Sequence, residues 1–133
     1  MSDESSRTSL ASASDLIKAF MKAYQAADEQ ALAACVSPDF VWHQHVGPDA
    51  PHGQTIEGVA ATVDVIRWRQ ANWRDLRYDD MRIRVSDDLI TQSFRVSGVD
   101  ENGKAFDVRA VDLYPVRDGR IAAKDTYWKQ VTG

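Results

Sequence analysis

The spacing of apolar residues predicts three helices in the first half of the chain. The first helix follows Ser14, and its apolar residues recur every three or four positions: Leu16, Ile17, Phe20, Met21 and Tyr24. Asp28 can cap a second, short helix in the stretch EQALAACV, which Pro38 closes. A third helix over 56–73 is indicated by Ile56, Val59, Ala60, Val63 and Ile66.

Strand patterns fill the rest of the chain. The stretch DFVWHQHV is rich in residues that favour strands, and the two prolines and two glycines of 47–54 predict a loop after it. From Arg74 onward apolar and polar residues alternate, and the stretches DENG and RDG indicate tight hairpins. We therefore expect four consecutive antiparallel strands at the end of the chain.

Helices followed by a run of strands are typical of an α+β domain. A long sheet twists strongly, so we expect a cone-shaped fold in which a curved, mostly antiparallel sheet encloses a cavity against three helices. The length of 133 residues suits one domain. The polar segment 1–12 is expected to be a flexible tail, followed by a single domain over 13–133.

Charge and composition narrow the functional classes. The net charge of -4 argues against sequence-independent binding of nucleic acid. No apolar run approaches the ~20 residues of a membrane helix, and the acidic N-terminus lacks a secretory signal. Cys35 is the single cysteine and cannot form an internal disulfide, so we expect a cytoplasmic protein. Acids balance a basic middle stretch, which predicts a solvated, salt-bridged surface for Arg67, Arg69, Arg74, Arg77, Arg82 and Arg84.

Four segments carry a resemblance to a known family: FMKAYQAAD, SPDFVWH, GQTIEGVAATVDVI and VDLYPVRDGRIAAKDTYW. Together with the order of elements, they resemble the nuclear transport factor 2-like superfamily, most closely its SnoaL-like and ketosteroid isomerase-like branches. The resemblance covers residues 14–131. It implies the cone-shaped fold, a homodimer and mostly metal-free sites. The reaction stays open, because the family includes isomerases, dehydratases, cyclases, epoxide hydrolases and binding domains.

Asp112 is the first candidate for chemistry. It shares a strand face with the apolar residues Phe106, Val108, Ala110 and Tyr114. A carboxylate on an apolar face is costly unless it is paired, protonated or used. The resemblance places Asp112 where family members have a cavity carboxylate. The alternative is a structural acid at an edge or hairpin, paired with Arg109 or Arg82.

The three histidines, His43, His45 and His52, form the second candidate group. On a strand, His43 and His45 lie on one side with Val41, whereas Trp42 and Gln44 lie on the other. The alternation leaves open which side faces the cavity. A histidine there would suit proton transfer at neutral pH. The alternatives are a solvated or packed pair, or a metal site for zinc or iron; we expect no metal.

The resemblance also shows two departures from the isomerase pattern. The catalytic carboxylate of the resembling isomerases falls on Gln44, which cannot act as a base, and their tyrosine on the first helix falls on Phe20. Both departures argue against ketosteroid isomerisation itself. A histidine would then supply the missing base.

Aromatic residues complete the expected site. Tyr127 could donate a hydrogen bond to a carbonyl or enolate oxygen, and it shares a face with Asp125. The substrate-binding aromatic residues are expected to be Trp42, Tyr24, Trp68, Phe94 and Trp128, with ordinary core packing as the alternative.

These residues predict a small enzyme that needs no cofactor. It would use His43 or His45 as a base, with Asp112 as the partner acid and Tyr127 as a donor, on a hydrophobic, cyclic or aromatic small molecule. Dehydration, isomerisation, cyclisation or a related lyase step would fit. One alternative is a binding domain without catalysis. The other is an epoxide hydrolase that uses Asp112 with Asp125. We expect no nucleic-acid or membrane partner and a homodimer.

Overall fold

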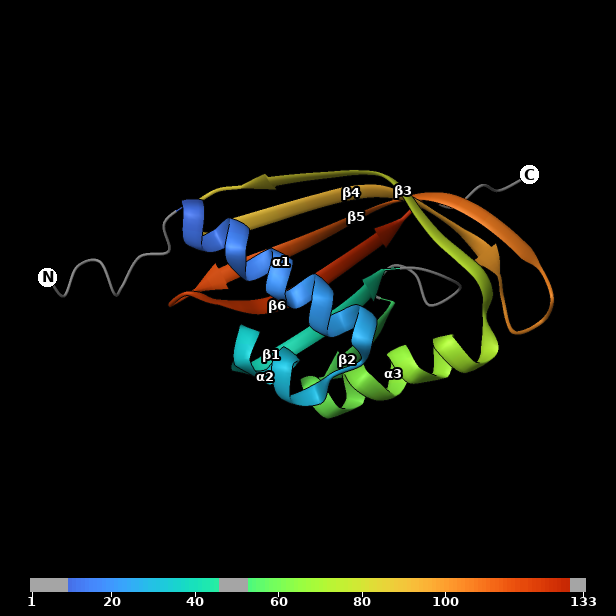
Figure 1. The fold of residues 1–133 in the computed structure, drawn as a ribbon, viewed down its shortest axis with the longest axis horizontal. Coiled ribbons are helices and arrows are strands. Elements are labelled where there is room, and N and C mark those ends of the chain that lie inside the picture. Colours follow the sequence, from blue (N-terminus) through green and yellow to red (C-terminus); the bar gives the residue numbers. More distant parts are fainter. Residues whose placement is uncertain (1–9, 46–52, 130–133) are drawn as a thin grey trace, which may run out of the picture.

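The computed structural model describes residues 10–45 and 53–129 and forms three helices and a six-stranded sheet (Figure 1). The helices are α1 (Leu10–Ala26), α2 (Glu29–Cys35) and α3 (Gly58–Asn72). The strands are β1 (Val36–His45), β2 (Gln54–Glu57), β3 (Arg74–Val85), β4 (Leu89–Val99), β5 (Ala105–Arg117) and β6 (Arg120–Trp128). The expected fold of three helices on a curved, mostly antiparallel sheet is confirmed.

The first two helices form for the reasons that their sequences indicate. Ala13, Ile17 and Phe20 recur at helical spacing and are all buried against the sheet. The helix begins at Leu10, so the expected tail over 1–12 is wrong for residues 10–12; residues 1–9 lie outside the described part. The side chain of Asp28 accepts a hydrogen bond from the backbone N–H of Ala31 at 3.1 Å, which caps α2 as expected.

The strands follow the order β2-β1-β6-β5-β4-β3 across the sheet. Strands β3 to β6 pair antiparallel with their sequence neighbours, as predicted. The turn between β5 and β6 has positive φ at both Asp118 (53°) and Gly119 (74°), which is the geometry that the RDG stretch favours. No described helix is both long and apolar enough to cross a membrane.

Strands β1 and β2 differ from the prediction. β2 lies where we expected a loop and the start of a helix. It pairs antiparallel with β1, and Ile56 is the partner of Trp42 across the two strands. Its four residues are too few to show an alternation. β1 also pairs in parallel with β6, which is distant in sequence. This parallel pair determines which residues of β1 and β6 share a face.

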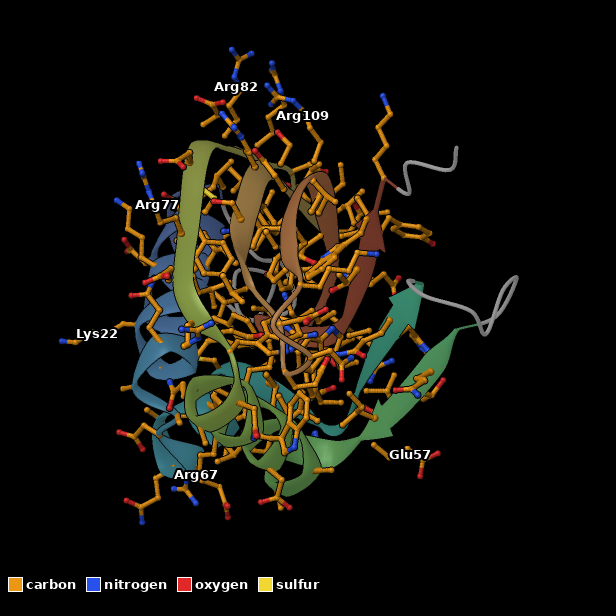
Figure 2. All side chains as sticks on the ribbon, turned by 90° about the vertical axis from the view of Figure 1, so that its right-hand side faces the viewer. Lys22, Glu57, Arg67, Arg77, Arg82 and Arg109 are labelled. Atoms are coloured by element: carbon orange, nitrogen blue, oxygen red, sulfur yellow. The ribbon has the colours of Figure 1, made fainter. Side chains whose placement is uncertain are left out.

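Alternation along the strands gives the sheet two distinct faces. The inner face packs against the helices, and the outer face points away from them. Buried inner-face residues are Ile90, Gln92, Phe94 and Val96 on β4, Ala110, Asp112, Tyr114 and Val116 on β5, Ile121, Lys124 and Thr126 on β6, and Trp42 and Gln44 on β1. The charged residues labelled in Figure 2 lie instead at the periphery, as expected for Arg67, Arg77 and Arg82.

Candidate functional site

A cavity of about 60 Å³ lies between the inner face of the sheet and the helices. Its lining includes Tyr24, Trp42, Phe94 and Trp128, four of the five aromatic residues that the sequence suggested for substrate binding. Trp68, the fifth, does not line it; its side chain is 47% exposed and contacts Trp73. Seven of the fifteen residues that line the cavity are aromatic, and such faces can contact an apolar ring.

Asp112 lies on the cavity wall and is 3% exposed. One carboxylate oxygen accepts a hydrogen bond from the hydroxyl of Thr126 at 2.6 Å, and the other accepts one from the ammonium of Lys124 at 2.7 Å. The expected position of Asp112 in a cavity is thus confirmed. The alternative partners are wrong: Arg109 pairs with Asp80 at 3.6 Å, and Arg82 points outward (Figure 2).

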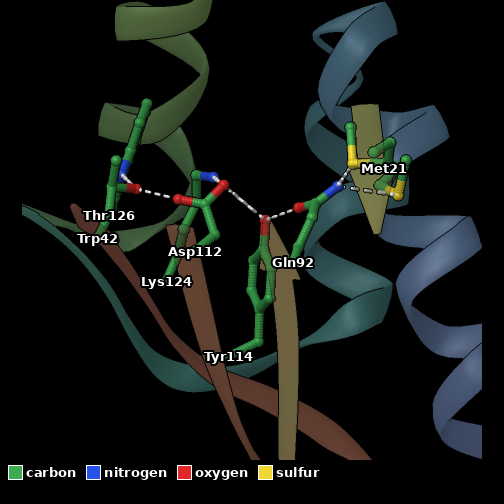
Figure 3. A network of polar contacts seen from close by, with 8 residues as sticks. Met21, Trp42, Gln92, Asp112, Tyr114, Lys124 and Thr126 are labelled. Carbon is green, nitrogen blue, oxygen red and sulfur yellow. Dashed lines mark hydrogen bonds and ion pairs between the residues drawn. The ribbon is translucent and has the colours of Figure 1, made fainter. Parts of the chain in front are cut away.

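Polar contacts continue from Asp112 in both directions (Figure 3). Thr126 accepts a hydrogen bond from the indole N–H of Trp42 at 2.9 Å. On the other side, the hydroxyl of Tyr114 lies 2.8 Å from the amide oxygen of Gln92 and 3.3 Å from Asp112. Because a hydroxyl has one proton, Tyr114 donates to one of these two acceptors at a time. The shorter contact favours Gln92.

Tyr114 can act as a donor over the whole ordinary pH range. Burial, and secondarily the negative charge of Asp112, hold the pKa of Tyr114 well above its usual value of 10. Its oxygen also lies 3.1 Å from the ammonium of Lys124. The hydroxyl therefore stays protonated beside the ion pair and can turn between two acceptors.

Lys124 is a site residue that sequence reasoning missed. It is 5% exposed, and its ammonium lies 5.1 to 5.3 Å from the ring centres of Tyr24, Trp42 and Tyr114. Each distance is within the range of a cation–π interaction. A usable signal was present, because Lys124 alternates with Thr126 and Trp128 on β6 and so shares their face.

Burying the Asp112–Lys124 pair is expensive. Taking two charges out of water costs several kcal/mol for each ion, and well-packed apolar residues of similar volume are often as stable or more stable. The pair lies at a cavity rather than in the closed core, where it can contact a ligand. Perturbed or paired charges in such a position are candidates for function.

Arg69 and Tyr24 also line the cavity. The guanidinium of Arg69 lies 4.6 Å from the ring centre of Trp73 and 5.0 Å from that of Trp42. The expectation of a solvated, salt-bridged Arg69 is therefore wrong. Burial raises the pKa of Tyr24 to about 12, an effect that the charge of Arg69 partly offsets. Tyr24 is thus a second protonated hydroxyl at the cavity.

His43 lies on the outer face of the sheet, opposite Asp112. Its neighbours in the strand, Trp42 and Gln44, are buried on the inner face, and its Nδ1 lies 3.3 Å from the hydroxyl of Thr55 on β2. The expectation that His43 and Asp112 meet in one cavity is therefore wrong. The side chain of His45 and all of His52 lie outside the described residues.

Asp125 and Tyr127 share the outer face with His43. In the register, Asp125 lies beside His43, and Tyr127 is 44% exposed. Tyr127 is therefore too far around the sheet to act as a donor in the cavity with Asp112. Asp125 and Asp112 likewise lie on opposite faces, so they cannot hold one water molecule between them as an epoxide hydrolase would require.

Among the described residues, no group of three histidine, cysteine or acidic side chains could hold a metal ion. This search does not include the side chains of His45 and His52, so the absence of a metal stays a prediction. The ionisable groups that line the cavity are Asp112, Lys124, Arg69 and the tyrosines Tyr24, Tyr78 and Tyr114. Among them, the carboxylate of Asp112 can accept a proton, and the ammonium of Lys124 and the tyrosine hydroxyls can donate hydrogen bonds.

Comparison with known proteins gives one family and a consistent fold. Residues 17–124 match the model of the SnoaL-like domain. No curated protein matches the chain significantly.

Solved structures with a similar fold include an NTF2-like protein from Burkholderia xenovorans, with 17% identity, a TM-score of 0.78 and 92% of both chains covered. A candidate polyketide cyclase from Xanthomonas campestris has 21% identity and a TM-score of 0.70 over 90% of this chain and 92% of that one. A candidate isomerase from Bacillus subtilis has 22% identity and a TM-score of 0.65 over 89% and 86%.

Proposed function

Because the chain belongs to the SnoaL-like domain family, we propose that it is a small, cofactor-independent enzyme that moves a proton on a ring-containing, hydrophobic small molecule. The reaction would take place in the cavity of Asp112 and Lys124. Similar folds include a candidate polyketide cyclase and a candidate isomerase, which suits this class of chemistry. The cytoplasmic location expected from the sequence stays a prediction.

One observation carries the proposal: a buried carboxylate and a buried ammonium lie 2.7 Å apart on the wall of an aromatic cavity. The two oxygens of a carboxylate can accept about four hydrogen bonds. Thr126 and Lys124 occupy two of these positions, and Tyr114 occupies a third only when its proton turns toward Asp112. Asp112 therefore retains the capacity to accept a proton from a ligand.

The hydrogen-bond donors beside Asp112 could stabilise the negative charge that such a reaction creates. When a proton leaves the carbon next to a carbonyl group, negative charge develops on the carbonyl oxygen. The ammonium of Lys124 and the hydroxyl of Tyr24 line the same cavity and can donate hydrogen bonds to that oxygen. Asp112 takes the proton from carbon and returns it at the same or another position. Exchange or isomerisation would follow when the proton returns to carbon. Dehydration would follow when Asp112 gives the proton to a neighbouring hydroxyl group, which leaves as water.

Proton exchange in heavy water tests this first step without knowledge of the natural product. Wild-type protein is incubated with a panel of cyclic and aromatic ketones, and loss of the α-proton signal is followed by NMR. We expect at least one ketone to exchange faster with the protein than without it. Asp112→Asn and Lys124→Met should lose this acceleration, because a positioned acid or base contributes about 10² to 10⁴-fold.

Asp107→Asn is the matched control for this experiment. Asp107 also lies on β5 and pairs with an arginine, but its side chain is 50% exposed and outside the cavity lining. This variant should exchange protons at the wild-type rate. Equal losses in Asp112→Asn and Asp107→Asn would contradict a role for the cavity.

A binding domain without catalysis is the second candidate. The observation that favours a binding domain is the close pairing of Asp112 with Thr126 and Lys124. Such pairing would also stabilise a buried carboxylate that has no catalytic role. In that case ketones would shift the NMR signals of cavity residues, and no ketone in the panel would exchange faster with the protein.

A further inference from the structure

The charged residues of the cavity do not balance one another. Three charged side chains line it: Arg69, Asp112 and Lys124. Asp112 and Lys124 form an ion pair with each other at 2.7 Å. Arg69 forms no ion pair with any carboxylate in the described part of the chain. The cavity therefore has one uncompensated positive charge, although the whole chain has a net charge of -4.

Three tryptophan rings hold the guanidinium of Arg69. Its central carbon lies 4.6 Å from the ring centre of Trp73, 5.0 Å from that of Trp42 and 5.9 Å from that of Trp128. Contacts over aromatic faces stabilise the cation and restrict its motion. The side chain of Arg69 also forms a hydrogen bond with the side chain of Tyr24. A guanidinium has five N–H groups, so others stay available at its edges. These N–H groups match the two oxygens of a carboxylate in a paired, bidentate geometry.

A purely structural role explains Arg69 less well. Arg69 lies in the last turn of α3, where a cation can interact with the helix dipole and with the final carbonyl groups. In residues 10–45 and 53–129, however, no backbone carbonyl accepts a hydrogen bond from its side chain. The side chain instead lines the cavity and an adjoining hollow of about 110 Å³. It thus lies where the two spaces meet.

We propose that the cavity selects a ring-containing carboxylic acid and that Arg69 binds its carboxylate. This inference rests on the proposed function and specifies its substrate class. Arg69 and Lys124 both lie over Trp42, at 5.0 and 5.3 Å from its ring centre. A ring placed beside Trp42 would therefore have both Arg69 and the Asp112–Lys124 pair as near neighbours. Arg69 holds the anionic end, and the ion pair faces the reacting end.

Three ligands of nearly the same shape and different charge test this selection. Benzoate, benzamide and benzylammonium are titrated into the labelled protein, and dissociation constants are measured from NMR shifts of cavity residues. We expect benzoate to bind at least about tenfold more tightly than benzamide, because a charge-assisted, bidentate contact is stronger than a neutral one. Benzylammonium should bind most weakly. Equal affinities for benzoate and benzamide in the wild type would overturn the inference.

Arg69→Gln should remove the preference for benzoate and leave the affinity for benzamide close to wild type. Arg67→Gln is the matched control, because Arg67 is two positions away on the same helix and points outward (Figure 2). It should keep the wild-type ratio. A preference that survives Arg69→Gln, or that is lost equally in Arg67→Gln, would contradict the assignment.

Arg69→Lys gives a second comparison if Arg69→Gln does not fold, as judged by circular dichroism. It keeps the charge without the planar fork, so the preference for benzoate should decrease, and an unchanged ratio would contradict bidentate binding. These titrations need no turnover. Loss of the benzoate preference with ketone exchange intact would refute only the carboxylate site. A benzoate preference without any exchange would refute only the enzymatic proposal.

Discussion

Removing one charge of the buried Asp112–Lys124 pair should destabilise the protein far more than removing a surface charge. Asp112 and Lys124 side chains are 4% and 7% exposed, and they lie 2.7 Å apart. At an effective dielectric constant of about 20, their gross Coulomb attraction is about 6 kcal/mol. Much of this attraction offsets the cost of desolvation. Breaking a buried pair by removing one partner typically costs about 3–5 kcal/mol, because the other charge stays buried.

The variants Asp112→Asn, Lys124→Met and the double variant form a thermodynamic cycle. The free energy of unfolding is measured by urea denaturation for each of them. We expect each single variant to lose about 3 kcal/mol or more. The double variant should lose clearly less than the sum of the two, because no charge is then left unpaired. Native proteins typically unfold with a free energy of about 5–15 kcal/mol, so losses of about 3 kcal/mol are easy to resolve.

Asp107→Asn again serves as the control, because its pair with Arg95 is about half exposed. Exposed pairs contribute about 0–1 kcal/mol, so this variant should change the free energy of unfolding little. The reasoning would be refuted by single variants that cost no more than Asp107→Asn. Strictly additive losses in the double variant would also refute it.

Two further predictions concern Tyr24 and the outer face of the sheet. Because burial holds the pKa of Tyr24 at about 12 against its usual 10, the folded protein keeps this proton between pH 10 and 12 while the unfolded chain loses it. The free energy of unfolding should therefore fall as pH rises through this window, and it should fall less in Tyr24→Phe; parallel curves for the two proteins would be inconsistent with a buried hydroxyl. The homodimer expected from the sequence stays a prediction, and the exposed Tyr127 on the outer face suggests where the copies would meet. Light scattering should give twice the monomer mass, with Tyr127→Glu shifting the protein toward monomer, whereas a monomeric wild type would rule the dimer out.

The helices and the hairpin strands were predictable because their signals are local. Residues such as Ile17 and Phe20 repeat at helical spacing, and Asp118–Gly119 indicates a tight turn without reference to the rest of the fold. Asp112 was predictable for a similar reason, since an acid on an otherwise apolar strand face needs an explanation. β2 was not predictable, because its four residues form a strand only by pairing with β1.

The histidine assignment failed because it depended on a contact between distant segments. Both faces of β1 carry large apolar residues, so alternation alone could not show which face is inner. The parallel pair of β1 with β6 decides this, because it brings Trp42 beside Lys124 and His43 beside Asp125. Lys124 and Arg69 were missed for a related reason. A charged residue predicts a solvated surface unless the partners that stabilise it in the interior are known.

Proton exchange on a ketone, compared between Asp112→Asn and His43→Gln, tests the central claim most directly. The two side chains lie on opposite faces of the same sheet, so the comparison locates the chemistry. If the inner-face cavity is the reactive site, Asp112→Asn should slow exchange by about a hundredfold or more, and His43→Gln should leave the rate unchanged. If His43→Gln slowed proton exchange and Asp112→Asn exchanged at the wild-type rate, the chemistry would lie on the outer face and the account would be contradicted.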